Sequence, residues 1–264
     1  ALVTPASAGT ARRHGRSALL DRLPAGPAWA VAGRSLRYWR RDPRYLTSIV
    51  ATFALPAAVL SLALLGMFSV RSAALAVGPL LGGVLGWGQH NDVAYDGTAV
   101  WTHVVSDLSG RADRAGRAAA VLVWAVPLTV VAAVAGCAVA DRWQLLPAVL
   151  GLSLGLLGIG TGVSAVSSAL LPYRVPEAGS NPFQTPSGAA VATLVAQAVT
   201  SSVTCALAVP VVVAFVLALL GSGTAGWVAL VLGAALGAAA VLAGVHLGGR
   251  LFERRGPELL AAMR

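Results

Sequence analysis

Six long apolar stretches constrain this chain more than any other feature of its sequence. They cover about residues 45–69, 72–90, 117–140, 145–171, 188–220 and 226–249. Each stretch is long enough to cross a hydrocarbon core about 30 Å thick as a helix. Only 11% of the 264 residues are charged and 57% are hydrophobic, whereas soluble domains carry about 25% charged residues. The sequence therefore predicts an all-α polytopic membrane protein with six transmembrane helices.

Two segments of different character precede the first span. Residues 1–26 are rich in Pro, Gly, Ala and Arg without apolar periodicity, and they indicate a flexible cytoplasmic tail or linker. Residues 27–44 open the transmembrane domain, residues 27–264. Apolar residues recur there at helical spacing between arginines, which predicts an amphipathic helix lying in the membrane interface. The residues predicted to place aromatic rings and guanidinium groups in this interface are Trp29, Trp39, Arg34, Arg37, Arg40 and Arg41.

Arginine placement predicts the orientation of the chain. All 19 basic residues are arginine, and 17 of them fall on one side if the spans alternate from a cytoplasmic N-terminus. Only Arg71 and Arg142 fall on the other side. Basic residues concentrate in cytoplasmic loops, so both termini are expected in the cytoplasm and the spans in a bacterial plasma membrane. The net charge of +9 is explained by arginines that flank apolar spans, which argues against nucleic-acid binding.

The polar segment between the second and third spans, residues 91–116, is the richest in candidate functional residues. Within it, residues 98–108 have the pattern of a short amphipathic helix. Two interpretations stay open: a cytoplasmic helix that docks onto a soluble partner, or an ordinary interfacial helix. The candidate docking residues of this loop are Tyr95, Asp96, Gly97, Trp101, Asp107, Arg111, Asp113 and Arg114.

The spans themselves offer little for catalysis or ion coupling. No Asp, Glu or Arg falls in the middle of a predicted span, which counts against transport coupled to protons or sodium. Cys137 and Cys205 lie in apolar stretches as packing residues, and no metal-ligand cluster or phosphate-binding glycine loop is visible. Glycines in the fourth and sixth spans, including Gly233 and Gly237, predict close helix packing.

One pair of residues suggests an enzyme. Ser164 in the fourth span and His246 in the sixth resemble the serine–histidine dyad of rhomboid-type intramembrane proteases. Ala165 stands where that family has a second glycine, and the predicted outer loops are too short for the family's first outer loop. An intramembrane serine protease is kept as an alternative to transport, as is one half of a secondary transporter.

The whole pattern resembles the permease subunits of ABC-2 type exporters, especially actinobacterial ones. The resemblance rests on the arginine-rich segment before the first span, six spans with very short outer turns, and the loop runs Tyr95-Asp96-Gly97-Thr98-Ala99 and Gly110-Arg111-Ala112-Asp113-Arg114-Ala115-Gly116-Arg117. It covers nearly all of the chain beyond residue 27.

The resemblance implies a transport subunit without a catalytic site of its own. Residues 27–44 would be the elbow helix, and the loop around residues 91–117 would carry the coupling helix that seats in a cytoplasmic ABC ATPase. That partner would bind ATP and magnesium, so no cofactor is expected in this chain. A second six-helix unit and membrane lipids would complete the transporter. The start at Ala1 raises the further expectation that the chain is the C-terminal half of a fused permease. A bent or divided fifth helix at Pro210 is also expected.

Overall fold

Six apolar helices form the body of the molecule, and they confirm the predicted all-α fold with six spans. The computed structural model describes residues 24–99, 101, 106, 108–176, 181, 184 and 186–262, and every regular element within them is helical. The helices long and apolar enough to cross a membrane are α2 (Arg44–Leu64), α3 (Val70–Trp87), α5 (Gly110–Ala140), α6 (Leu146–Leu170), α7 (Ala190–Leu219) and α8 (Gly223–Arg254).

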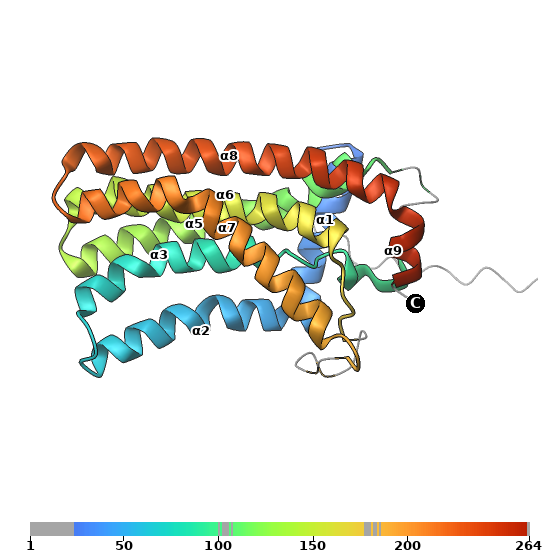
Figure 1. The fold of residues 1–264 in the computed structure, drawn as a ribbon, viewed down its shortest axis with the longest axis horizontal. Helices are drawn as coiled ribbons and strands as arrows, with labels where there is room; N and C mark the ends of the chain where they lie inside the picture. The colour runs from blue at the N-terminus through green and yellow to red at the C-terminus, as the bar shows by residue number, and fades with distance from the viewer. Residues whose placement is uncertain are drawn as a thin grey trace, which may run out of the picture.

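The spans lie side by side and alternate in direction, which gives the bundle two different ends (Figure 1). One end, the turn end, holds the connections α2–α3, α5–α6 and α7–α8, the second of which contains η3 (Trp143–Leu145). The other, the α1 end, holds α1 (Pro27–Arg41), η2 (Ala94–Ala99) and α9 (Gly256–Ala262). Helix α1 lies across this end instead of running along the bundle.

Helix α6 is the centre of the bundle. It packs against α3, α5, α7 and α8, whereas α2 packs chiefly on α3. Glycines allow α6 and α8 to touch backbone to backbone: a Cβ atom on Gly162 would clash with the carbonyl of Ala240, and one on Gly233 with the carbonyl of Gly151. Without a hydrophobic driving force between helices in lipid, such small residues permit the close packing that holds them together. The predicted packing role of these glycines is confirmed.

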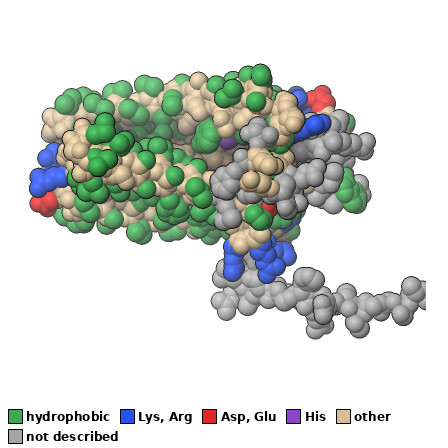
Figure 2. Space-filling view, turned by 90° about the horizontal axis from the view of Figure 1, so that it is seen from below, with side chains coloured by type: hydrophobic (Ala, Val, Ile, Leu, Met, Phe, Trp, Pro, Cys, Tyr) green, Lys and Arg blue, Asp and Glu red, His purple; other side chains and the backbone are tan. Residues whose placement is uncertain are grey.

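Apolar side chains cover the outside of the spans. Leu64 is 76% exposed, Leu242 73% and Val231 65%, and Figure 2 shows hydrophobic side chains along the length of the bundle with charged ones near its ends. Soluble monomers rarely expose continuous apolar patches larger than a few hundred Å². Lipid is therefore the solvent of this surface, and the chain is a membrane protein.

Several predicted boundaries differ from the observed ones. The third span was expected from residue 117 after a loop over 91–116, but α5 begins at Gly110. The reason is local: the Ser109 hydroxyl accepts a hydrogen bond from Ala112 N at 3.3 Å, and this N-cap starts the helix before its apolar part. Similarly, α8 continues through Arg250 to Arg254, a stretch expected to be a basic tail.

Two prolines lie at positions that shape the course of the helices. Pro210 lies inside α7, which is one continuous helix that bends along its length instead of dividing (Figure 1). Pro43 follows the end of α1, and the Asp42 carboxylate accepts hydrogen bonds from Arg44 N and Arg44 Nε, both at 3.0 Å.

Helix α1 covers most of residues 27–44, as the sequence predicts. Its role as an elbow helix stays a prediction, and the expected coupling helix over 98–108 lies largely outside the described residues.

Candidate functional site

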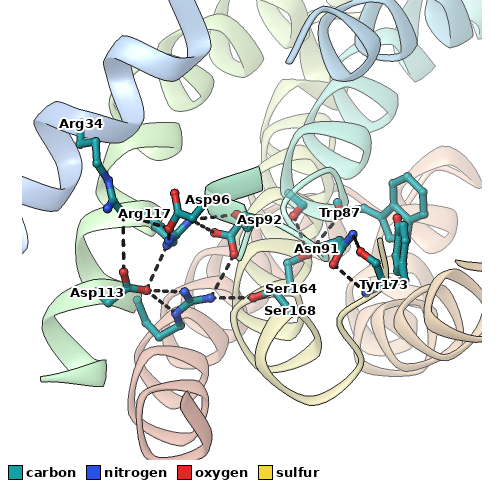
Figure 3. Close-up of polar contacts among 12 residues, drawn as sticks. Arg34, Trp87, Asn91, Asp92, Asp96, Asp113, Arg117, Ser164, Ser168 and Tyr173 are labelled. Atoms are coloured by element: carbon teal, nitrogen blue, oxygen red, sulfur yellow. Dashed lines mark hydrogen bonds and ion pairs between the residues drawn. The ribbon is translucent and has the colours of Figure 1, made fainter. Parts of the chain in front are cut away.

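A cluster of six charged side chains is buried at the α1 end of the bundle (Figure 3). Five of these side chains are at most 8% exposed, and the sixth, Arg34, is 24% exposed. We call this group the charged cluster; its members are Arg34, Asp92, Asp96, Asp113, Arg114 and Arg117. Three guanidinium groups face three carboxylates, so the cluster is electrically balanced.

The first two turns of α5 supply half of the charged cluster. Arg117 Nε lies 3.0 Å from Asp113 Oδ2, one turn earlier on the same helix, and Arg114 also pairs with Asp113. Arg114 Nη1 donates to Ser168 Oγ of α6 at 2.6 Å. The spacing of three and four residues puts these groups on one face of α5, which is turned toward the protein interior.

The connection after α3 and the helix α1 supply the other half. Asp92 Oδ1 lies 3.0 Å from Arg114 Nη1, and Arg117 pairs with Asp96. From α1, Arg34 Nη2 lies 3.2 Å from Asp96 Oδ2. The cluster therefore joins four parts of the chain: α1, the α3–α5 connection, α5 and, through Ser168, α6. Removing one partner of a buried ion pair costs about 3–5 kcal/mol, so these parts are held firmly together.

A second set of contacts fastens the end of α3 to the segment after α6. The Asn91 side chain donates to the Tyr173 carbonyl at 2.9 Å and accepts from Tyr173 N at 3.2 Å. His90 Nε2 lies 2.8 Å from the Tyr173 hydroxyl, and Nδ1 lies 2.9 Å from the Trp87 carbonyl. A carbonyl can only accept, so Nδ1 carries the proton, and in the neutral ring Nε2 then accepts from the hydroxyl.

Burial governs the protonation of this pair. It lowers the pKa of His90 from its ordinary value of 6.5, although the Trp87 carbonyl and the charge of Asp92 act in the opposite direction. Burial also raises the pKa of Tyr173 to about 12. Both groups are therefore neutral at physiological pH, in agreement with a hydroxyl that donates to an unprotonated imidazole nitrogen.

The candidate docking residues divide into buried and exposed members. Asp96, Asp113 and Arg114 are buried in the charged cluster. Tyr95 is half-buried, and its carbonyl accepts from Arg44 Nη2 at 2.9 Å. Gly97 is half-buried in a turn with φ of 52°, a conformation that favours glycine.

Two other candidates lie at the surface: Trp101 is 54% exposed, and Arg111 is also exposed. Asp107 lies outside the described residues. Among the described candidates, the two exposed side chains are therefore the ones that a soluble partner could touch directly.

The six aromatic and basic residues predicted for the interfacial helix also divide. Trp29, Arg37, Arg40 and Arg41 are exposed on α1, whereas two half-buried residues turn toward the bundle. Arg34 enters the charged cluster. The ring of Trp39 packs edge-on against Trp124 of α5, with centroids 5.1 Å apart, and contacts Tyr45 at 4.8 Å.

Sequence reasoning underrated four residues of this region. Asp92 and Arg117 were not among the candidate docking residues, although Asp113 and Arg117 have the four-residue spacing of a helical ion pair. Asn91 and Tyr173 were not singled out as partners. Their contact joins residues 82 positions apart, and no local pattern in the sequence points to it.

Ser164 and His246, the residues of the hypothetical protease dyad, have separate partners. The Ser164 hydroxyl is fully buried and donates to the carbonyls of Gly86 and Trp87, at 2.9 and 3.2 Å. His246 Nε2 lies 3.3 Å from Arg111 Nη2. These contacts account for both side chains without bringing them together. Within the described part of the chain, no group of His, Cys, Asp and Glu is placed to hold a metal ion.

Comparison with known proteins yields no relative: no family model, curated protein or solved structure matches this chain.

Proposed function

We propose that this chain is the transmembrane permease subunit of an ATP-driven exporter of the ABC-2 type. In this proposal a separate cytoplasmic ATPase binds ATP and magnesium, and this chain moves an apolar or amphipathic substrate outward. The functional transporter contains a second six-helix unit. The α1 end of the bundle faces the cytoplasm, and α1 is the elbow helix of the family that the sequence resembles.

The charged cluster is the observation that carries the proposal. It ties the α3–α5 connection, where the family would seat its coupling helix, to α1 through Arg34 and to α5 and α6 through Arg117 and Arg114. A displacement of that connection by a partner must move these helices with it, because separating buried ion pairs is costly. Such a rigid link is what a subunit needs if force applied at its surface is to rearrange its spans.

The mechanism follows from this link. Binding of ATP closes the partner ATPase, the closure pushes on the connection between α3 and α5, and the charged cluster passes the movement to α1, α5 and α6. The long helices α5 and α6 then shift at the turn end as rigid rods, and the path for the substrate opens outward. No bond chemistry is assigned to this chain.

Exposed Trp101 provides the sharpest test of docking. Large aromatic residues often contribute most of the binding energy at interfaces, about 2 kcal/mol or more on truncation. We expect Trp101→Ala to reduce stimulation of a co-expressed partner ATPase at least tenfold in proteoliposomes while the protein folds normally.

The matched control is Trp143→Ala. Trp143 is 52% exposed but lies in η3 at the turn end, so its replacement should leave stimulation unchanged. Equal effects of the two variants, or no effect of either, would contradict the docking assignment. Transport that continues after ATP is depleted would instead indicate a secondary transporter.

A further inference from the structure

A second group of basic residues lies at the α1 end, where the beginning of α5 meets the end of α8. It consists of Arg111 from α5 and, from α8, His246, Arg250 and Arg254; we call it the α5–α8 basic patch. The three arginines are exposed and the histidine is half-buried. Residues 246, 250 and 254 are four apart and so lie on one face of α8.

Close backbone contact fixes the two helices at this point. A Cβ atom on Gly249 would lie 2.7 Å from Arg111 N, so the helices approach as only glycine allows. Glu253 Oε1 accepts a hydrogen bond from Gly110 N at 2.7 Å, which satisfies one of the free amides at the start of α5. The Arg111 guanidinium then reaches His246, with 3.3 Å between Nη2 and Nε2. Since a guanidinium can only donate, the imidazole accepts.

The arginines of this patch lack the carboxylate partners that several other arginines of this end have. Arg34, Arg114 and Arg117 pair with aspartates, and Arg255 Nε lies 2.7 Å from Glu258 Oε2. Within the described part of the chain, no ion pair involves Arg111, Arg250 or Arg254. Several unneutralised guanidinium groups on one surface attract an anion.

The same face of α8 changes from apolar to basic along its length. Leu242 is one turn before His246 in the row that continues to Arg250 and Arg254, and it is 73% exposed. Leu247, also on this part of α8, is 51% exposed. Four residues advance a helix by about 6 Å, so the row places an apolar surface directly beside a cationic one. An amphiphile with an anionic head and a hydrocarbon chain has the complementary arrangement.

We propose that the α5–α8 basic patch binds an anionic phospholipid of the leaflet at the α1 end. Its phosphate lies between Arg111 and Arg250, and an acyl chain follows α8 along Leu242. Arg254 extends the positive surface toward the headgroup. Because α5 also carries three residues of the charged cluster, the bound lipid is attached to the element that the cluster holds in place. The inference stands whether or not the chain binds an ATPase.

Binding of phosphatidylglycerol to the purified full chain tests this inference. Native mass spectrometry in detergent would compare phosphatidylglycerol with phosphatidylcholine of the same acyl chains. We expect clear preference for the anionic lipid, and a loss of about fivefold in affinity for each of Arg111→Gln and Arg250→Gln, as expected for one basic residue near an anionic surface. Thermal unfolding in phosphatidylcholine checks that both variants fold.

Two control variants separate a defined site from general attraction. Arg142→Gln removes an exposed arginine at the turn end, and Arg40→Gln removes one from α1; both should bind phosphatidylglycerol as the unmodified chain does. Equal losses in all four variants, or no preference for the anionic lipid, would overturn the proposal. Glycerol phosphate, which has the headgroup chemistry without acyl chains, should not displace the lipid at equal concentration. Displacement by it would show a site for free phosphates and would also overturn the proposal.

Discussion

Asp113 faces two guanidinium groups of its own helix, and its side chain is 0% exposed. Replacement by alanine would leave Arg114 and Arg117 with less compensating charge in a buried place. We expect Asp113→Ala to destabilise the protein by about 3–5 kcal/mol, seen as a large fall in the thermal unfolding temperature in detergent. The control is Glu258→Ala, which removes a carboxylate that is 66% exposed and should change stability by no more than about 0.5 kcal/mol. Similar unfolding temperatures for the two variants would show that the charged cluster is not a structural link.

His90, which contacts Tyr173 at the end of α3, makes the stability of the protein depend on pH. Its pKa in the folded protein is lowered from 6.5 by burial, so the unfolded chain binds more protons between that lowered pKa and 6.5. Stability from this residue is therefore complete above about pH 6.5 and decreases as the pH falls toward the folded pKa, by at most about 1.4 kcal/mol per pH unit. Unfolding temperatures measured from pH 7.5 to 5.5 should fall less steeply for His90→Gln than for the unmodified chain. Parallel slopes would refute this role of His90.

At the residue scale, the sequence indicated where polar chemistry lies but not which way the side chains point. The polar segment 91–116 was predicted to hold the candidate functional residues. Its aspartates and arginines were interpreted as a surface for a partner, whereas Asp96 and Asp113 point inward. Pairing of Arg34 with Asp96 bridges 62 positions of sequence, and only the three-dimensional arrangement of α1 across the bundle end creates it.

At the scale of elements, the contact between α6 and α8 depends on glycines that have no room for a side chain. A Cβ atom on Gly162 would clash with the carbonyl of Ala240. Because this carbonyl belongs to the backbone and cannot rotate away as a side chain could, the helices themselves must separate. We expect Gly162→Ala to destabilise the bundle by about 1–3 kcal/mol, the usual cost of overpacking. Thermal unfolding in detergent measures this change.

The control for this substitution is Gly83→Ala in α3. A Cβ atom there would lie 3.9 Å from Leu156, an ordinary contact, and alanine favours a helix by up to about 1 kcal/mol over glycine. Gly83→Ala should therefore leave stability unchanged or raise it. A loss of stability at Gly83 as large as at Gly162 would mean that glycine content alone, and not the close contact, sets the effect.

Element boundaries show where apolar pattern alone is a sufficient guide. The starts and ends of α6 and α7 agree with the predicted spans within two residues, since turn residues and prolines border them. The start of α5 and the end of α8 were misplaced because both helices continue beyond the apolar stretch into charged sequence. At those ends, the N-cap Ser109 and the hydrogen bond between Gly110 and Glu253 stabilise the helices beyond their apolar parts. A hydropathy pattern contains no signal for either contact.

At the scale of the whole molecule, charge separates the two ends of the bundle. Twelve of the 14 described arginines belong to the α1 end, and only Arg71 and Arg142 to the turn end. The positive-inside rule therefore predicts that the α1 end faces the cytoplasm. Cysteine labelling tests this orientation. Cys137 and Cys205 are first replaced by serine, and single cysteines are then introduced at the two ends of the bundle. We expect Ser222→Cys, in the α7–α8 turn, to react with a membrane-impermeant thiol reagent in intact cells. Glu258→Cys, in α9, should react only after the membrane is permeabilised, and the reverse result would invert the protein and remove the cytoplasmic docking surface.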